Sequence, residues 1–178
     1  MAVARNLTLA LALVTLACLL AWYAGCNRAP ASSSGNMKTI SVVIGGETFE
    51  LEPAVDEQSR QRGLMLRTNI PDQGGMLFVF PDKEIQVQHF WMGHCLVDMD
   101  IIYLDSHGRI TATHRMKAEP PQRPDESDAE YDRRMRRYSS AYPAQFAIEL
   151  KAGSLDRLNL KVEDRIPLDL DRLKAMTR

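Results

Sequence analysis

The sequence predicts a mainly β domain with short helices, an α+β chain built around an antiparallel β-sandwich or barrel. Short runs rich in β-branched and aromatic residues recur along the chain, and turn residues such as Gly, Pro, Asn and Asp separate them. With 178 residues, 45% hydrophobic and 25% charged, the chain has enough apolar material for one core. A formal net charge of -1 gives no indication of binding to nucleic acid.

Residues 1–25 have the composition of a secretory signal peptide or a membrane anchor. Arg5 is their only charged residue, and the uncharged run 7–25 is close to the ~20 residues that cross a bilayer. The run ends in "AGC", which resembles the lipobox before the lipid-modified cysteine of bacterial lipoproteins. We therefore expect lipidation of Cys26 and an exported, membrane-anchored protein that faces the periplasm or the cell exterior. An uncleaved anchor and ordinary secretion are the alternatives.

The exported part divides into a tether and one domain. Residues 26–37 are small and polar, which is typical of a flexible tether, and residues 38–174 form the predicted domain. Once Cys18 leaves with the signal and Cys26 carries the lipid, Cys95 is the remaining cysteine. No disulfide is therefore expected inside the domain, and its core must supply the stability.

The first half of the domain is predicted to contain a hairpin, a short helix and a buried strand. Gly45 and Gly46 separate two β-rich runs, and both glycines accept the positive φ of a tight hairpin turn. Asp56 or a neighbouring residue is expected to cap a short helix in "AVDEQSRQRG", and Gly63 can end it in the left-handed conformation. The apolar run 74–80 is too short for a typical helix and predicts a strand.

The second half of the domain is predicted to continue with strands around one inserted segment. Strands are expected at 87–93, 99–105, 109–116 and 144–153, and a helical turn and a last strand follow. Residues 117–143 are predicted to be a loop and helix insertion, because a Pro-rich loop leads into the capping box "SDAE", which opens a helix.

Five blocks of the sequence, in order, resemble the domain of unknown function family 192 (DUF192) of bacteria and archaea. The blocks are "RQRGLMLR", "GGMLFVF", "FWMGHCLVDMDIIYLD", "AQFAIELKAG" and "LKVEDRI". Together they cover roughly residues 38–170. The resemblance implies a small β-rich domain of jelly-roll-like sandwich type that is often exported, and it implies no activity.

Several positions depart from the pattern of that family. Gly93, His94 and Cys95 stand where the family usually has a Lys-Asn-Thr trio. Asp98 stands at a usual proline, and Glu163 stands at a usual turn glycine. If the trio lines a site in the family, the chemistry of that site is altered in this chain.

The stretch around His94 is rich in residues that bind metals, but its spacing does not favour a metal site. On a strand, residues an odd number apart face opposite sides, which separates His94 from both His89 and Cys95. Thiol catalysis needs a histidine within hydrogen-bond reach of the sulfur, and adjacent residues of a strand point apart. We therefore expect no metal, no cofactor and no catalytic residue.

The candidate ligand-binding residues are Arg62, Arg67, Trp91, His94 and Asp100. The two arginines flank the apolar "GLML", and a guanidinium pairs well with a carboxylate, so Asp100 is expected to meet one of them. That pair would be either a bridge within the scaffold or the polar end of a pocket. The first hypothesis is a non-catalytic, membrane-tethered module that binds a small polar ligand or a saccharide.

Two alternatives stay open. An envelope hydrolase would use Asp98, Asp100 or His94, because paired carboxylates can perform acid–base chemistry in a cleft. Clustering of those side chains in one open cleft would favour this enzyme. A structural or protein-interaction lipoprotein would instead use residues 117–143 as the contact surface for an envelope protein.

Overall fold

The structure, a computed structural model, describes residues 39–177. The predicted signal peptide, the predicted tether and Cys26 lie outside the described residues. Within the described residues, no helix combines the length and the hydropathy that a membrane crossing requires.

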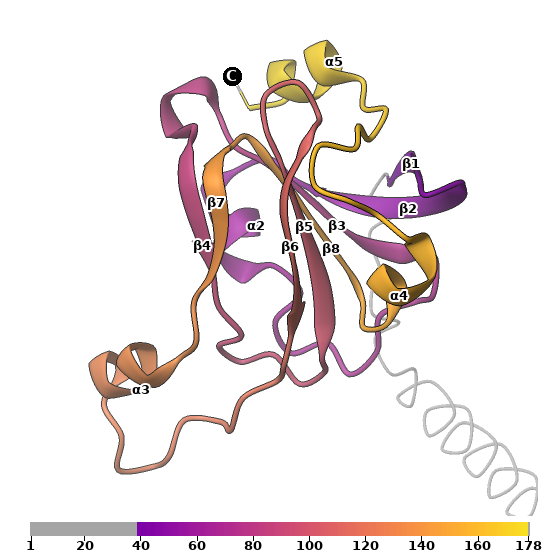
Figure 1. Cartoon of the computed structure of the whole chain (residues 1–178). Helices are drawn as coiled ribbons and strands as arrows, with labels where there is room; N and C mark the ends of the chain where they lie inside the picture. The colour runs from indigo at the N-terminus through magenta and orange to yellow at the C-terminus, as the bar shows by residue number, and fades with distance from the viewer. Residues whose placement is uncertain (1–38, 178) are drawn as a thin grey trace, which may run out of the picture. The chain divides into compact units, whose positions relative to one another are not determined.

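The described residues form two sheets and a few short helices, which confirms the mainly β prediction (Figure 1). The larger sheet has six strands in the order β1 (Ile40–Ile44), β2 (Glu47–Ala54), β3 (Gly74–Val79), β8 (Phe146–Lys151), β5 (Met99–Leu104) and β6 (Ile110–Met116). The smaller sheet pairs β4 (Gln86–Phe90) with β7 (Tyr138–Ala144). The helices are α2 (Glu57–Arg62), α3 (Asp128–Arg134), α4 (Ser154–Leu158), α5 (Leu170–Ala175) and the 3-10 turn η1 (Asp82–Glu84).

The larger sheet is open, with β1 and β6 at its edges, so the barrel alternative is wrong for the described residues. One strand pair also departs from the antiparallel prediction, because β2 and β3 run parallel. Parallel neighbours need a crossover connection, and residues 55–73, which carry α2, supply it. The jelly-roll-like type stays a prediction.

Several turns and helices form where local sequence signals predict them. Gly45 and Gly46, with φ values of 57° and 87°, form the turn that joins β1 to β2. The carboxylate of Asp56 caps α2 by accepting the backbone N–H of Ser59 at 2.8 Å. Ser127 opens α3 in the predicted capping box. These signals depend only on neighbouring residues, which is why the sequence reveals them.

Apolar side chains bury both faces of the larger sheet. Alternate residues of β3 show this arrangement, since Met76 and Phe78 belong to one core cluster and Leu77 and Val79 to the other. The first cluster includes residues of β7, and the second includes residues of α4 and α5. A strand buried on both faces is expected to be almost entirely apolar, so a charged residue inside one is informative.

β7 is a strand in a segment where the sequence predicts a loop and a helix. It pairs with β4 across a register shift between Val87 and His89. Its sequence, "YSSAYPA", contains two serines and a proline, which weaken the strand pattern. Ser140 is nonetheless fully buried, and its hydroxyl accepts the backbone N–H of Gln88 at 2.9 Å. Pairing with a distant strand, not local preference, therefore makes this segment a strand.

Two predicted strand segments are shorter than expected or absent. β4 ends at Phe90, so strand alternation does not apply to His94, which has a φ of 56°. Near the C-terminus the last predicted strand is reduced to one bridge between Arg109 and Arg165. Glu163, with a φ of 76°, makes a turn just before that bridge and interrupts the extended chain.

Candidate functional site

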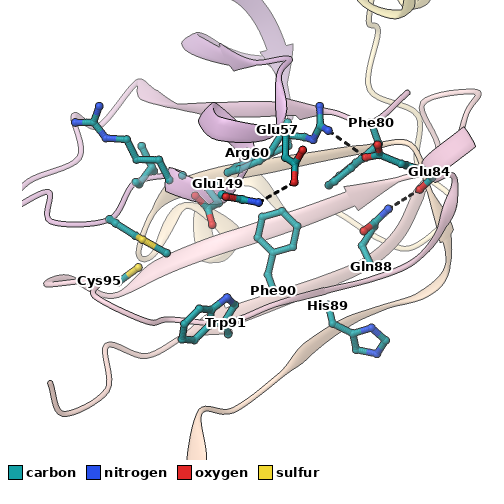
Figure 2. Close-up of a pocket in the computed structure, with 16 residues that line it drawn as sticks. Glu57, Arg60, Phe80, Glu84, Gln88, His89, Phe90, Trp91, Cys95 and Glu149 are labelled. Carbon is teal, nitrogen blue, oxygen red and sulfur yellow. Dashed lines mark hydrogen bonds and ion pairs between the residues drawn. The ribbon is translucent and has the colours of Figure 1, made fainter. Parts of the chain in front are cut away.

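A cavity of about 380 Å³ opens beside α2 and β4. Its lining comes from α2 and the loop after it, from β3 and η1, from β4 and the turn that follows, and from β8. Side chains of β4 alternate here: Figure 2 shows the ring of Phe90 directed into the same space as Glu149, whereas His89 points away. Segments far apart in the sequence therefore build one concave surface.

Glu149, on the central strand β8, is the buried acid of this cavity. Its cross-strand neighbours are Met76 and Ile101, and the residue is 6% exposed. Burial raises the pKa of the Glu149 carboxyl to about 8, and the backbone N–H of Leu64 offsets part of that rise. Its Oε2 atom has no hydrogen-bond partner within residues 39–177. The cavity therefore contains a buried carboxyl oxygen that has no hydrogen-bond partner among the described residues.

Aromatic rings line the same cavity. The ring of Phe90 makes edge contacts with Phe78 and Phe80, at centroid separations of 4.9 and 6.4 Å. The guanidinium of Arg60 lies 5.6 Å from the centroid of Phe80 and pairs with Glu84 at 3.0 Å. Because these partners hold the guanidinium, it forms no ion pair with the buried acid of β8.

Trp91 lines the cavity and also contacts the inserted segment. Arg137 lies 5.1 Å from a ring centroid of Trp91, and Tyr131 of α3 meets that side chain with centroids 6.1 Å apart. A β-carbon at Gly93 would come within 2.2 Å of the Trp91 ring, so only glycine leaves room for this ring position. The glycine that departs from the family pattern thus sets where Trp91 lies.

Cys95 contributes a buried thiol to the cavity. Burial and, to a smaller extent, the charge of Glu149 raise the pKa of the Cys95 thiol to about 12. The sulfur is therefore protonated at neutral pH and behaves as a small apolar group. This environment does not favour a thiolate nucleophile.

The expected ion pair between Asp100 and an arginine is wrong. Asp100 is 1% exposed, and its Oδ2 accepts the backbone N–H of Leu155 in α4 at 2.8 Å. Arg67 instead pairs with both carboxylate oxygens of Glu52, at 2.7 and 2.6 Å. Strand alternation explains the outcome, since Asp100 shares its face of β5 with Ile102, whose cluster packs against α4. Asp100 therefore faces away from the cavity.

The five predicted binding residues do not gather around one cavity. Arg62 and Trp91 line the cavity described above, whereas Arg67 lines a second, more open depression. His94 is exposed, with its ring against α3, and Asp100 lies on the opposite face of the larger sheet. The role of these residues in ligand binding stays a prediction.

The residues of the hydrolase hypothesis also lie apart. The side chain of Lys117 donates to Asp98 at 2.7 Å and lowers the pKa of that carboxyl, and Ala118 adds a backbone N–H at 2.8 Å. Asp98, Asp100 and His94 are all missing from the lining of the cavity. Across the described part of the chain, no three His, Cys, Asp or Glu side chains come together in a way that could hold a metal ion.

Sequence reasoning missed Glu149. The signal is a single acid between apolar neighbours in "AQFAIELK", on a strand that is buried from residue 146 to residue 150. A strand prediction alone does not single out this acid, because a strand with one face in water also carries charges at alternate positions. Knowledge that both faces of β8 are covered is needed to see that Glu149 is unusual.

Comparisons with known proteins agree with this fold. A candidate transcription regulator from Sinorhizobium meliloti 1021 is 29% identical, with a TM-score of 0.54, and the match covers 71% of this chain and 89% of that protein. A protein of unknown function from Novosphingobium aromaticivorans DSM 12444 is 24% identical, with a TM-score of 0.60, and the match covers 76% of this chain and 89% of that protein. None of the curated proteins compared with the chain matches it. Residues 40–168 match the family DUF192, described as "Uncharacterized ACR", and the chain therefore belongs to that family.

Proposed function

We propose that the domain is a non-catalytic module that binds a small polar organic ligand in the cavity of Glu149. One observation carries the proposal: Oε2 of this buried carboxyl has no hydrogen-bond partner within the described residues, and it lies in a concave, aromatic-lined space. A buried polar group without a hydrogen-bond partner costs about 1–3 kcal/mol. A ligand that hydrogen-bonds to Oε2 would remove that cost, so the unpaired position favours binding.

The size and the walls of the cavity support the proposal. A volume of about 380 Å³ falls in the range of roughly 300–1,000 Å³ that is usual for small-molecule sites. The lining combines aromatic rings with polar side chains, and such sites use polar groups of this kind to orient a ligand. Phe78 and Phe90 hold each other in an edge contact, so the walls need little ordering when a ligand arrives.

Binding has more support than hydrolysis. Glycoside hydrolysis needs two carboxyl groups that flank one cleft. Asp98 pairs with Lys117, and Asp100 accepts a hydrogen bond from α4 on the opposite face of the sheet, so they flank no common space. A saccharide is one candidate ligand, because rings such as Trp91 can stack on a sugar, and it belongs in the test.

Ligand-observed NMR on the full-length protein tests the proposal. The fragment library should include monosaccharides, amines, alcohols and carboxylic acids. We expect some fragments to bind and their affinity to fall about tenfold or more in Glu149→Gln, which removes the acid at constant shape. Asp98→Asn is the matched control, because it removes an acid outside the cavity and should leave binding unchanged. If no fragment responds to Glu149→Gln, the cavity is not the binding site.

We further propose that a lipid on Cys26 holds this module at the cell envelope. The support is the apolar run of residues 7–25 and the lipobox-like "AGC" at its end. Cys26→Ser should abolish metabolic labelling with a fatty acid and release the protein from the membrane fraction. Cys95→Ser is the control, since Cys95 lies inside the domain. Labelling that survives Cys26→Ser would reject lipidation at this position.

A further inference from the structure

We infer that the ligand of this cavity is an organic cation, with an ammonium group that meets Glu149 and a small apolar or aromatic body. The inference rests on the proposed function, because it names the class of ligand for the same cavity. Two features carry it: the lack of a cation beside Glu149 and the aromatic rings near its free oxygen.

The other buried acids of the described residues accept hydrogen bonds, and one of them also forms an ion pair. Glu126 accepts hydrogen bonds from Arg134 at 2.6 and 3.0 Å. Asp100 accepts a backbone N–H at the start of α4. Glu149 forms no ion pair within residues 39–177, and its Oε2 is without a donor. Since a buried carboxylate needs an opposite charge or several donors, the missing partner of Glu149 is best supplied by a cation.

An aromatic ring and the free oxygen border the same open position. A β-carbon at Gly63 would lie 3.4 Å from the ring of Phe78 and 3.6 Å from Oε2 of Glu149, and the glycine leaves that position empty. Aromatic faces attract ammonium groups within ~6 Å of the ring centroid. Two further rings of the cavity, Phe80 and Trp91, already have arginine side chains over them. A cation at Oε2 would therefore find both a carboxylate and aromatic surface.

A saccharide fits the inner cavity less well. Leu64, Phe78 and Cys95 lie near Glu149 and offer few hydrogen-bonding side chains, whereas the other polar residues of the lining belong to α2, η1 and β4. A sugar ring carries several hydroxyl groups, and each buried one needs a partner. A ligand with one strong donor group and an apolar body leaves no polar group unpaired, which favours a simple amine over a polyol.

The remaining charged and titratable groups of the cavity are Glu57, Arg60 and Arg62 of α2, Glu84 of η1, His89 of β4, and Cys95. Arg60 and Glu84 neutralise each other in their ion pair, and Glu57 accepts a hydrogen bond from Gln61 at 3.0 Å. Arg62 is exposed, and His89 points away from the buried acid (Figure 2). Glu149 is thus the buried acid of this cavity, and the other unpaired charged groups lie at its exposed rim.

Binding of a cation by this carboxyl is coupled to the loss of a proton. Because burial raises the pKa of Glu149 to about 8, the free carboxyl is mainly protonated at neutral pH. When the ammonium group binds, the O–H bond of the carboxyl breaks, the proton passes to the buffer, and the ammonium group keeps its own protons. Affinity should therefore rise up to about tenfold per pH unit and level off above about pH 8.

Isothermal titration calorimetry with three probes of equal size tests the inference. Benzylammonium, benzyl alcohol and benzoate share one ring and differ in the charge of the attached group. At about pH 7 with the full-length protein, benzylammonium should bind at least about tenfold more tightly than benzyl alcohol. Benzoate should bind more weakly than benzylammonium, because its negative charge cannot pair with Glu149 and opposes ionisation of this carboxyl.

Two further measurements link the preference to Glu149. Titration of the wild-type protein in two buffers of different ionisation enthalpy should show release of close to one proton per benzylammonium bound at about pH 7. Glu149→Gln should equalise the amine and the alcohol and abolish the proton release. Asp98→Asn should retain both effects. The proton count needs no variant, so it decides the question even if Glu149→Gln fails to fold.

The results that would overturn the cation inference differ from those that would overturn the proposed function. Equal or tighter binding of benzyl alcohol without proton release would overturn the cation inference and leave a cavity that binds neutral molecules through a protonated Glu149. Tightest binding of benzoate would also overturn it. If the fragment library gives ligands that depend on Glu149 but no amine binds, only the cation inference falls. If no fragment binds at all, both proposals fall.

Discussion

Glu149→Gln should remove a loss of stability that the wild-type protein shows as the pH rises above the ordinary pKa of a glutamate. The pKa of this carboxyl rises from an ordinary value of 4.5 to about 8 on folding. Between these two values the unfolded chain has lost the proton and the folded protein still holds it. The folded state then binds more protons than the unfolded state, so stability falls as the pH rises through this window.

The magnitude follows from the same shift. Each pH unit between the two pKa values lowers the free energy of unfolding by about 1.4 kcal/mol, so the cost is about 3 kcal/mol at pH 7. The residue is 6% exposed, so solvent screens this effect very little. Glutamine has the same shape and no proton to lose. The variant should therefore match the wild type near about pH 5 and exceed it progressively toward about pH 8.

Urea unfolding of the full-length protein at several pH values measures this difference. Asp98→Asn is the control: hydrogen bonds lower the pKa of Asp98, so its contribution to stability changes only under acidic conditions and stays constant above about pH 5. A difference between Glu149→Gln and the wild type that is constant from about pH 5 to about pH 8 would refute a buried carboxyl with a raised pKa.

Three other substitutions or reactions test the surroundings of the cavity. Gly93→Ala should displace the Trp91 ring, because the new methyl group would lie 2.2 Å from it, and calorimetry should show about tenfold weaker binding of benzylammonium. Tyr103→Phe removes a buried hydrogen bond of 2.8 Å to a backbone carbonyl of β7 and should lower the free energy of unfolding by about 1–2 kcal/mol in urea. Alkylation of Cys95 at about pH 9, followed by peptide mass spectrometry, should be slow and should accelerate in Glu149→Gln, because the charge of Glu149 contributes to the raised pKa of the thiol. An alkylation rate that is unchanged in Glu149→Gln would show that the charge of Glu149 does not affect the Cys95 thiol.

The parts of the fold that the sequence predicts well are those set by neighbouring residues. The Gly45–Gly46 turn and the helix caps at Asp56 and Ser127 are local, and all three form as expected. β7 was missed because its serines and its proline give no clear strand pattern, and only pairing with β4 makes it a strand. The parallel pairing of β2 with β3 likewise depends on how the whole sheet is assembled.

The candidate site was also predictable only in part, because it too depends on how distant segments pack together. Trp91 and Arg62 were identified from the sequence, and both line the cavity. The partner of Asp100 was not predictable, because an acid on a strand can face either side of a sheet, and α4 covers the side that it faces. Glu149 stands out only once both faces of β8 are known to be buried. Which charged group lacks a partner is a property of the assembled core.

Glu149 is easier to explain as a binding group than as part of the scaffold. A leucine or methionine at this position would avoid the cost of about 3 kcal/mol at pH 7 that the raised pKa implies. A glycine also leaves space beside the acid: a β-carbon at Gly63 would lie 3.6 Å from its free oxygen, and the glycine keeps that space open. Gly75 permits the close approach of β3 to the backbone of β8, whatever side chain residue 149 carries. A cation in that space would recover much of the cost, so stability and affinity should respond to pH in opposite directions through one carboxyl.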